Sequence, residues 1–181
     1  MNFALQNLLG SHDTERLLTL CGGNVEREKL AVLFQMTYPG APMVYYGDEI
    51  GMEGGRDPEC RATMVWQKSE QRSDLHEWYR GMIALRRAHP VLRRGTFVTM
   101  LTDDVQKVYV FARKDDTSCA VVALNAGVSP AHVVLPLGAL AGTGSWQVVQ
   151  PAGKPVEAGH DGKYTAVIPG MSGTVFLNEK K

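Results

Sequence analysis

The chain has 181 residues, of which 44% are hydrophobic and 21% charged, and its formal net charge at pH 7 is zero. This composition is typical of a globular protein large enough for a sizeable core in one or two domains. The balanced charge provides no basic surface for nucleic acid or for an anionic membrane, so neither is expected as a partner.

Strands and helices alternate in the first part of the chain. Residues 1–9 are predicted to form a strand that ends at Gly10. Residues 26–38 carry apolar side chains at three-four spacing and acidic residues in the first turn, which predicts a helix. Pro39 and Gly40 stop this helix, and residues 43–46 are predicted to form a second short strand.

A long loop rich in glycine and charge is expected over residues 48–72, followed by a second helix over residues 74–89. Asp74 and Glu77 have the spacing of a capping box, and an apolar stripe runs along this helix. The order strand, helix, strand, helix implies two parallel strands. Two parallel strands cannot close a sheet, so we expect residues 1–90 to be part of a larger structure.

After Pro90 no helical pattern is found, and short strand-like runs separated by turn residues predict an antiparallel sandwich over residues 91–181. The expected strands are residues 96–101, 107–112, 118–124, 132–135, 145–149, 164–168 and 173–177.

The longest apolar run, residues 119–124, is too short to cross a bilayer, and the first ten residues contain no signal-peptide pattern. The three cysteines form no C-x-x-C pair, so neither a zinc site nor a disulfide framework is expected. We therefore expect reduced thiols, a cytoplasmic location and no cofactor.

Two stretches resemble conserved segments of the α-amylase family of glycoside hydrolases, family thirteen. NLLGSHDTERLL, residues 7–18, is similar to the fourth conserved region of that family. GAPMVYYGDEIGMEGGRDPECRATMVW, residues 40–66, is similar to its eighth barrel strand and the loop that follows. The resemblance is closest to the neopullulanase, cyclomaltodextrinase and maltogenic amylase branch.

The resemblance implies an α/β plus all-β protein. Residues 1–90 would be the carboxy-terminal part of a catalytic (β/α)8 TIM barrel, from strand 7 to helix 8. Residues 91–181 would be the carboxy-terminal β-sandwich domain. The family's active-site residues lie at the carboxyl ends of the barrel strands.

The pair His12-Asp13 has two possible roles. The resemblance implies that Asp13 stabilises the transition state by binding sugar hydroxyls, and that His12 donates to a hydroxyl of the same sugar. The residues alone allow another interpretation, in which Ser11 or Asp13 caps a helix that starts near Thr14. A Ser-His-Asp triad is excluded, because consecutive residues cannot align as nucleophile, base and orienting acid.

Asp57 and Arg61 are four positions apart in the loop. The resemblance implies that they bind glucose units further from the cleavage point, since a carboxylate accepts and a guanidinium donates hydrogen bonds to hydroxyls. A loop-stabilising salt bridge between the two is the alternative, and both can hold. Arg16 is expected to pack or to pair with a nearby carboxylate.

Aromatic residues and adjacent acids follow the second strand. Tyr45 and Tyr46 are expected to pack with bonded hydroxyls, while Trp66 is left open between loop anchor and sugar platform. Asp48 and Glu49 alone provide too few oxygen ligands for calcium, so no metal site is assigned.

The family's nucleophilic Asp and acid/base Glu belong to regions expected upstream of residue 1. The sequence therefore predicts a carboxy-terminal portion of a retaining hydrolase of α-1,4- or α-1,6-linked glucans, inactive alone. Its expected partners are an α-glucan oligosaccharide or cyclodextrin, and the missing barrel portion or a second copy of the chain. Two alternatives remain open: a non-catalytic glucan-binding module, and an interaction fragment of a split gene product.

Overall fold

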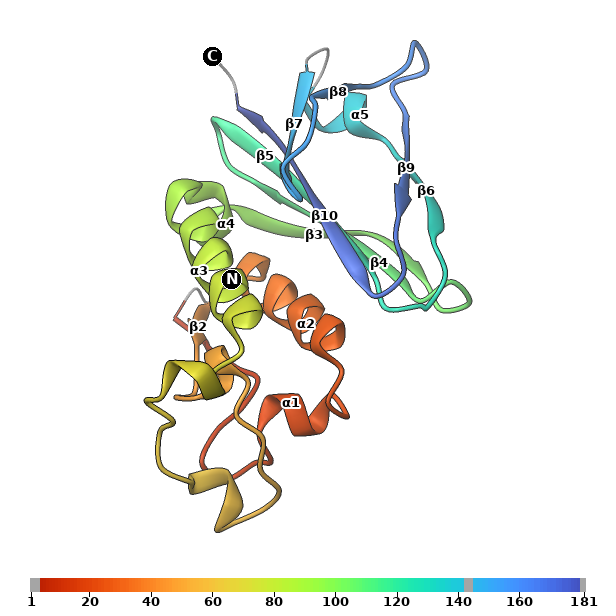
Figure 1. Cartoon of the computed structure of the whole chain (residues 1–181). Coiled ribbons are helices and arrows are strands. Elements are labelled where there is room, and N and C mark those ends of the chain that lie inside the picture. The colour runs from red at the N-terminus through yellow and green to blue at the C-terminus, as the bar shows by residue number, and fades with distance from the viewer. Residues whose placement is uncertain (1–3, 142–144, 180–181) are drawn as a thin grey trace. The chain divides into compact units, whose positions relative to one another are not determined.

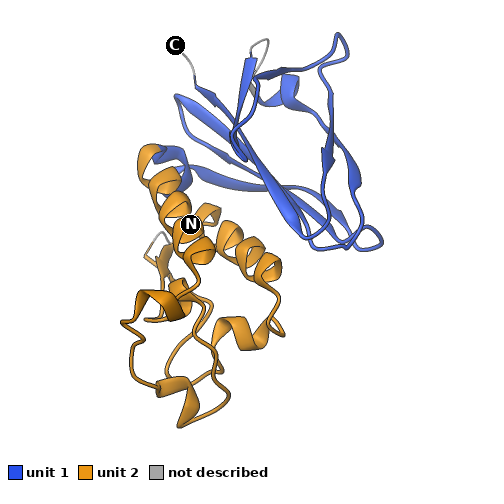
Figure 2. Ribbon diagram, in the orientation of Figure 1, with its two compact units in different colours: residues 1, 89–181 blue, residues 2–88 orange. Residues whose placement is uncertain are grey.

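The computed structural model describes residues 4–141 and 145–179, and its elements are labelled in Figure 1. The chain forms two compact units (Figure 2). Residues 2–88, in orange, are called the mixed unit here, and residues 89–181, in blue, are called the β unit. Across the described residues, no helix is both long and apolar enough to cross a membrane.

The mixed unit contains two short parallel strands joined by a helix. β1 (Gln6–Leu8) pairs with β2 (Ala41–Met43), and Leu8 lies opposite Met43. α2 (Val25–Thr37) connects them, and the Asn24 side chain caps it by accepting a hydrogen bond from the Arg27 backbone at 3.0 Å. The helix expected over residues 26–38 and the parallel pairing are therefore confirmed.

The second strand lies earlier than predicted, at Ala41–Met43 instead of residues 43–46. The chain turns at this point because the Asp48 backbone donates to the Tyr45 carbonyl at 3.1 Å and Gly47 adopts a left-handed φ of 89°. Of the strand predicted over residues 1–9, the described part is Gln6–Leu8, and residues 1–3 lie outside the described residues.

The loop after β2 contains three 3-10 turns, η1 (Asp48–Ile50), η2 (Glu59–Arg61) and η3 (Lys68–Glu70), and a short helix α1 (Leu17–Leu20) follows β1. α3 (Ser73–Ala88) matches the second predicted helix and packs on α2. Its buried Arg86 donates to the carbonyls of Met36 and Tyr38, at 2.7 and 3.1 Å. Arg86 thus satisfies carbonyl groups that the end of α2 leaves open.

The β unit is an antiparallel structure of two sheets. The larger sheet has the order β3-β4-β5-β10-β7-β8, and the smaller sheet pairs β6 with β9. The strands of the larger sheet are β3 (Thr96–Asp103), β4 (Val108–Lys114), β5 (Ser118–Asn125), β10 (Ser172–Glu179), β7 (Ser145–Gln150) and β8 (Val156–Glu157). Those of the smaller sheet are β6 (Ala131–Leu135) and β9 (Tyr164–Ile168). Both sheets contribute to one hydrophobic core that contains the fully buried Trp146.

The seven predicted strands of the β unit are all present, but β8 was not predicted. The expectation of no helix after Pro90 is wrong, because α4 (Pro90–Arg94) and α5 (Leu137–Ala141) are helical. Both have five residues, too few for a three-four pattern to be visible. Pro90 occupies the start of α4, where its fixed φ favours the helix.

Candidate functional site

The His12-Asp13 pair lies in a turn directly after β1. The Ser11 backbone donates to the Thr14 hydroxyl at 2.9 Å, and the Asp13 backbone donates to the Ser11 hydroxyl at 3.2 Å. α1 begins only at Leu17, and Arg16, its N-cap, makes no side-chain capping bond. The interpretation of Ser11 or Asp13 as the cap of a helix starting near Thr14 is therefore wrong, and both Asp13 carboxylate oxygens lie outside any helix terminus.

The structure brings all four predicted site residues into one connected set of side-chain contacts, called the site network here. His12 Nε2 lies 3.2 Å from Asp13 Oδ2, and Asp13 Oδ1 lies 3.3 Å from Arg61 Nη2. Arg61 Nε in turn lies 3.1 Å from Asp57 Oδ1, so the predicted pairing of Asp57 with Arg61 is confirmed. The arginine links the two carboxylates, one from each of the two loops that follow β1 and β2.

These side chains remain open to solvent. The exposed fractions are 59% for His12, 71% for Asp13, 48% for Arg61 and 66% for Asp57. Exposed ion pairs contribute only about 0–1 kcal/mol each. The site network therefore adds little to the stability of the fold. Its hydrogen-bond donors and acceptors are accessible to hydroxyl groups of a ligand.

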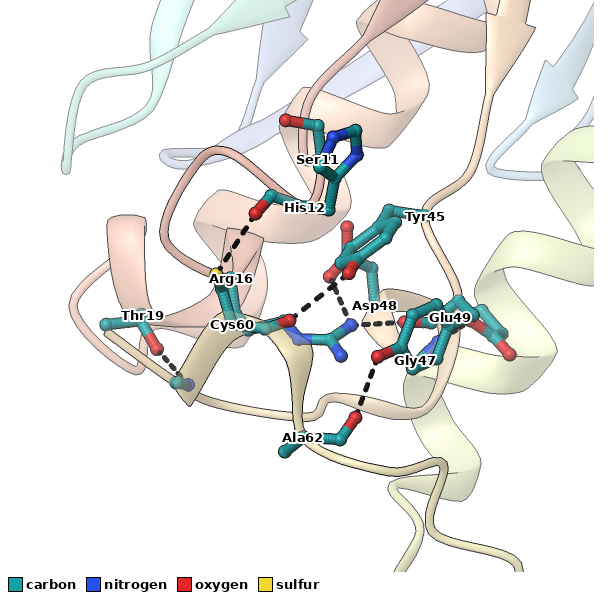
Figure 3. Close-up of polar contacts among 12 residues, drawn as sticks. Ser11, His12, Arg16, Thr19, Tyr45, Gly47, Asp48, Glu49, Cys60 and Ala62 are labelled. Atoms are coloured by element: carbon teal, nitrogen blue, oxygen red, sulfur yellow. Dashed lines mark hydrogen bonds and ion pairs between the residues drawn. The ribbon is translucent and has the colours of Figure 1, made fainter. Parts of the chain in front are cut away.

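Residues next to the site network connect the loop after β1 to the loop after β2 (Figure 3). The Cys60 thiol donates to the His12 carbonyl at 3.3 Å, and the Tyr45 hydroxyl donates to the Cys60 carbonyl at 3.3 Å. The Gly54 backbone donates to the Thr19 hydroxyl at 2.9 Å. Cys60 directly precedes Arg61, so this contact fixes the backbone that carries the central arginine to the backbone that carries Asp13.

Arg16 is fully buried behind the turn, as the prediction of packing or pairing requires. Its guanidinium carbon lies 4.5 Å from the ring centres of both Tyr45 and Tyr46, and Nη1 lies 3.7 Å from Asp48 Oδ1. The Tyr46 hydroxyl donates to the Ala62 carbonyl at 2.8 Å. Both tyrosine hydroxyls are bonded, as expected, but the expectation that both rings are buried is wrong for Tyr46, which is 40% exposed.

Two buried carboxyl groups lie beneath this surface. Burial raises the pKa of Asp48 to about 6, and the Arg16 guanidinium acts in the opposite direction. Burial also raises the pKa of Glu28, on α2, to about 7, although the Tyr79 hydroxyl donates to it at 3.2 Å. Burial and the nearby Glu28 charge raise the pKa of Tyr79, so this hydroxyl stays protonated.

No cluster of three or more metal-ligating side chains occurs among residues 4–141 and 145–179. Trp66 is 80% exposed, which argues against a role as a buried loop anchor. The contact of Arg61 with Asp13 and the contact of Cys60 with His12 were not predicted. The one signal for them is topological, because loops that follow the carboxyl ends of two adjacent parallel strands meet on the same side of the sheet.

The mixed unit is similar to proteins of a known family. Residues 1–78 match the family model described as alpha amylase, catalytic domain. A cyclomaltodextrinase of Geobacillus thermopakistaniensis is 45% identical over 148 residues, which are 82% of this chain and 25% of the relative. Neopullulanase 2 of Thermoactinomyces vulgaris is 50% identical over 124 residues, 68% of this chain and 21% of the relative.

A solved structure extends the similarity to both units. The alpha-amylase from Geobacillus thermoleovorans, complexed with acarbose, has a TM-score of 0.87 at 28% identity. The alignment covers 99% of this chain and 40% of that chain. The chain thus spans about a quarter of the length of the curated relatives it matches.

Proposed function

Because this chain belongs to the alpha-amylase family, of whose catalytic domain it carries a part, we propose that it supplies one catalytic carboxylate and several sugar contacts to an α-glucan hydrolase. The hydrolase would be a retaining enzyme of the neopullulanase and cyclomaltodextrinase type, acting on α-1,4 or α-1,6 linkages. The observation that carries the proposal is the chain of contacts from His12 through Asp13 and Arg61 to Asp57.

Asp13 is the proposed transition-state stabiliser. Its carboxylate accepts hydrogen bonds from two hydroxyls of the sugar at the reacting position, and these bonds strengthen as the ring flattens toward the oxocarbenium-like state. Arg61 holds one Asp13 oxygen at 3.3 Å, which orients the carboxylate before the sugar arrives. His12 donates to a hydroxyl of the same sugar.

Arg61 and Asp57 are proposed to bind glucose units further from the cleavage point. The guanidinium only donates and the carboxylate only accepts, so together they can bind adjacent hydroxyls of one sugar. Their present ion pair at 3.1 Å is exposed, and exchanging it for sugar contacts costs little.

The nucleophile and the acid/base are proposed to come from barrel units that these 181 residues do not contain. The short β1–β2 sheet supports this proposal, because Leu5 and Leu8 are 60% and 47% exposed beside it. Such side chains are covered in a complete barrel by neighbouring strands and helices. The proposed partner is therefore the remaining barrel portion or a second copy of the chain.

A chimera tests the proposal. This chain replaces the matching segment of the Geobacillus cyclomaltodextrinase, and Asp13→Asn is compared with Asp104→Asn, an exposed turn residue of the β unit. We expect Asp13→Asn to lower kcat by about a hundredfold or more, with a much smaller change in KM. Asp104→Asn is expected to leave both unchanged. Near-normal kinetics for Asp13→Asn would overturn the proposed role.

A further inference from the structure

Arg16 connects the loop after β1 to the loop after β2 from within the protein interior. Its side chain is fully buried, its guanidinium stacks on Tyr45 and Tyr46, and it donates to the Tyr46 carbonyl. Its own backbone donates to the Gly54 carbonyl at 2.9 Å. One residue, three positions after Asp13, thus contacts the second loop both before and after η1.

Asp48 contacts both ends of the turn that carries His12 and Asp13. On one side its Oδ1 lies 3.7 Å from Arg16 Nη1. On the other side a Cβ added to Gly10 would lie 2.4 Å from its Oδ2, so the carboxylate occupies the space that any larger residue at position 10 would need. The turn from position 10 to position 16 is therefore held at its two ends by a single buried side chain.

The buried Arg16–Asp48 pair is not expected to contribute much to the stability of the fold. Nε and Nη2 of Arg16 and Oδ1 of Asp48 are buried and find no hydrogen-bond partner among the described residues. Burying an ion pair costs several kcal/mol per charge in desolvation, and apolar replacements are often equally stable or more stable. A buried pair with incomplete hydrogen bonding is better explained by the geometry that it imposes than by the energy that it contributes.

The geometry that it imposes is that of the reacting carboxylate. We propose that the Arg16–Asp48 pair is a positioning device that holds the Ser11–Thr14 turn, and with it Asp13, at the distance from the second loop that catalysis requires. This inference rests on the proposed function of Asp13. Neither residue is proposed to touch the substrate, since both are buried while His12 and Asp13 are exposed.

The first test uses the 181-residue chain and needs no activity. Hydrogen exchange at the Ser11, Asp13 and Thr14 amides is measured in Arg16→Lys and Asp48→Asn. The control is Arg86→Lys, which alters another buried arginine of the same unit that donates to carbonyls at the end of α2. We expect exchange in the turn to accelerate about tenfold or more in the first two variants and to stay unchanged in the control.

The second test measures kinetics in the chimera. Arg16→Lys keeps the charge but loses the planar stack, and it is expected to lower kcat by about a hundredfold, as a displaced catalytic group does. KM is expected to change by less than about threefold. Arg86→Lys is expected to lower the Tm and leave kcat unchanged. If Arg16→Lys fails to fold, Asp48→Asn and Gly10→Ala probe the same contact from its other side.

The outcomes separate the two proposals. An Asp13→Asn chimera with normal kinetics overturns the proposed function, whatever Arg16 does. An inactive Asp13→Asn chimera together with an Arg16→Lys chimera that resembles Arg86→Lys overturns the positioning role alone. Unchanged exchange in the turn of both Arg16→Lys and Asp48→Asn likewise overturns it, because a turn held in place by other contacts does not need this pair.

Discussion

The guanidinium of Arg61 lies 3.3 Å from the carboxylate of Asp13, although the two residues are 48 positions apart in the sequence. The contact joins the loop after β1 to the loop after β2. It makes Arg61 the one described residue that pairs with both predicted acidic site residues, Asp13 and Asp57. The consequences of this relationship, and of the packing around it, can be measured.

Arg61→Ala tests the surface contacts. In the chimera we expect kcat/KM to fall about tenfold or more, because Asp13 loses its orienting partner and the outer sugar loses a donor. Arg56→Ala is the matched control, since Arg56 is 92% exposed and its nearest carboxylate, Glu15, is 3.9 Å away. Equal losses in steady-state kinetics for the two variants would show that Arg61 acts only through general charge.

The 181-residue chain is predicted not to hydrolyse glucans. A retaining mechanism needs a nucleophilic carboxylate and an acid/base on opposite sides of the bond, and we propose that barrel units outside these 181 residues supply both. Purified chain with maltotriose, cyclodextrin or pullulan should release no reducing sugar, while a cyclomaltodextrinase in the same assay does. Turnover that co-purifies with the chain and is lost in Asp13→Ala would contradict this prediction.

Self-association of the isolated chain is expected through the β1–β2 sheet. Its unpaired strand edges and the exposed Leu5 and Leu8 can pair with another copy. Leu8→Lys should reduce the mass measured by chromatography with light scattering toward that of one chain. Val128→Lys, at a 90% exposed position of the β unit, should have no such effect. A monomeric wild-type chain would show that the open edges are tolerated.

Glu28 predicts an unusual dependence of stability on pH. The pKa of its carboxyl rises from 4.5 to about 7 on folding, so the folded state binds this proton more tightly than the unfolded state. The contribution to stability is complete below pH 4.5 and is lost as the pH rises to about 7. Denaturant unfolding at both pH values measures the loss.

The variant Glu28→Gln is neutral at every pH and keeps an acceptor for the Tyr79 hydroxyl. At pH 8 it should raise the free energy of unfolding by roughly 1–3 kcal/mol and flatten the pH dependence. Glu26→Gln, on the exposed side of the same helix, should change it by less than about 0.5 kcal/mol. A destabilised Glu28→Gln would indicate that the carboxylate is charged and paired in the folded protein.

Two tryptophans provide a matched test of the β unit core. Trp146→Ala removes a fully buried side chain and should cost about 3–5 kcal/mol in chemical unfolding of the full chain. Trp66→Ala removes an 80% exposed side chain and should leave the stability of the full chain within about 0.5 kcal/mol. A small effect of Trp146→Ala would mean that the sandwich core collapses easily around the cavity.

The sequence by itself determined the two long helices, most of the strands and one contact between residues close together in the chain. Three-four spacing located α2 and α3, because a helix buries one continuous stripe. Alternating apolar residues and turn signals located seven of the strands in the β unit. The contact between Asp57 and Arg61 could also be predicted, since the two residues are only four positions apart in the sequence.

Only the tertiary structure shows that Asp13 does not cap a helix. Spacing could not distinguish a helix cap from a surface carboxylate, and only the observed turn, with α1 starting at Leu17, excludes the cap. The burial of Arg16 and Asp48 could not be predicted from the sequence either, because the burial of a charged residue depends on which segments pack over it. Contacts such as Arg61 with Asp13 form between distant segments when two parallel strands align, and local sequence carries no record of that alignment.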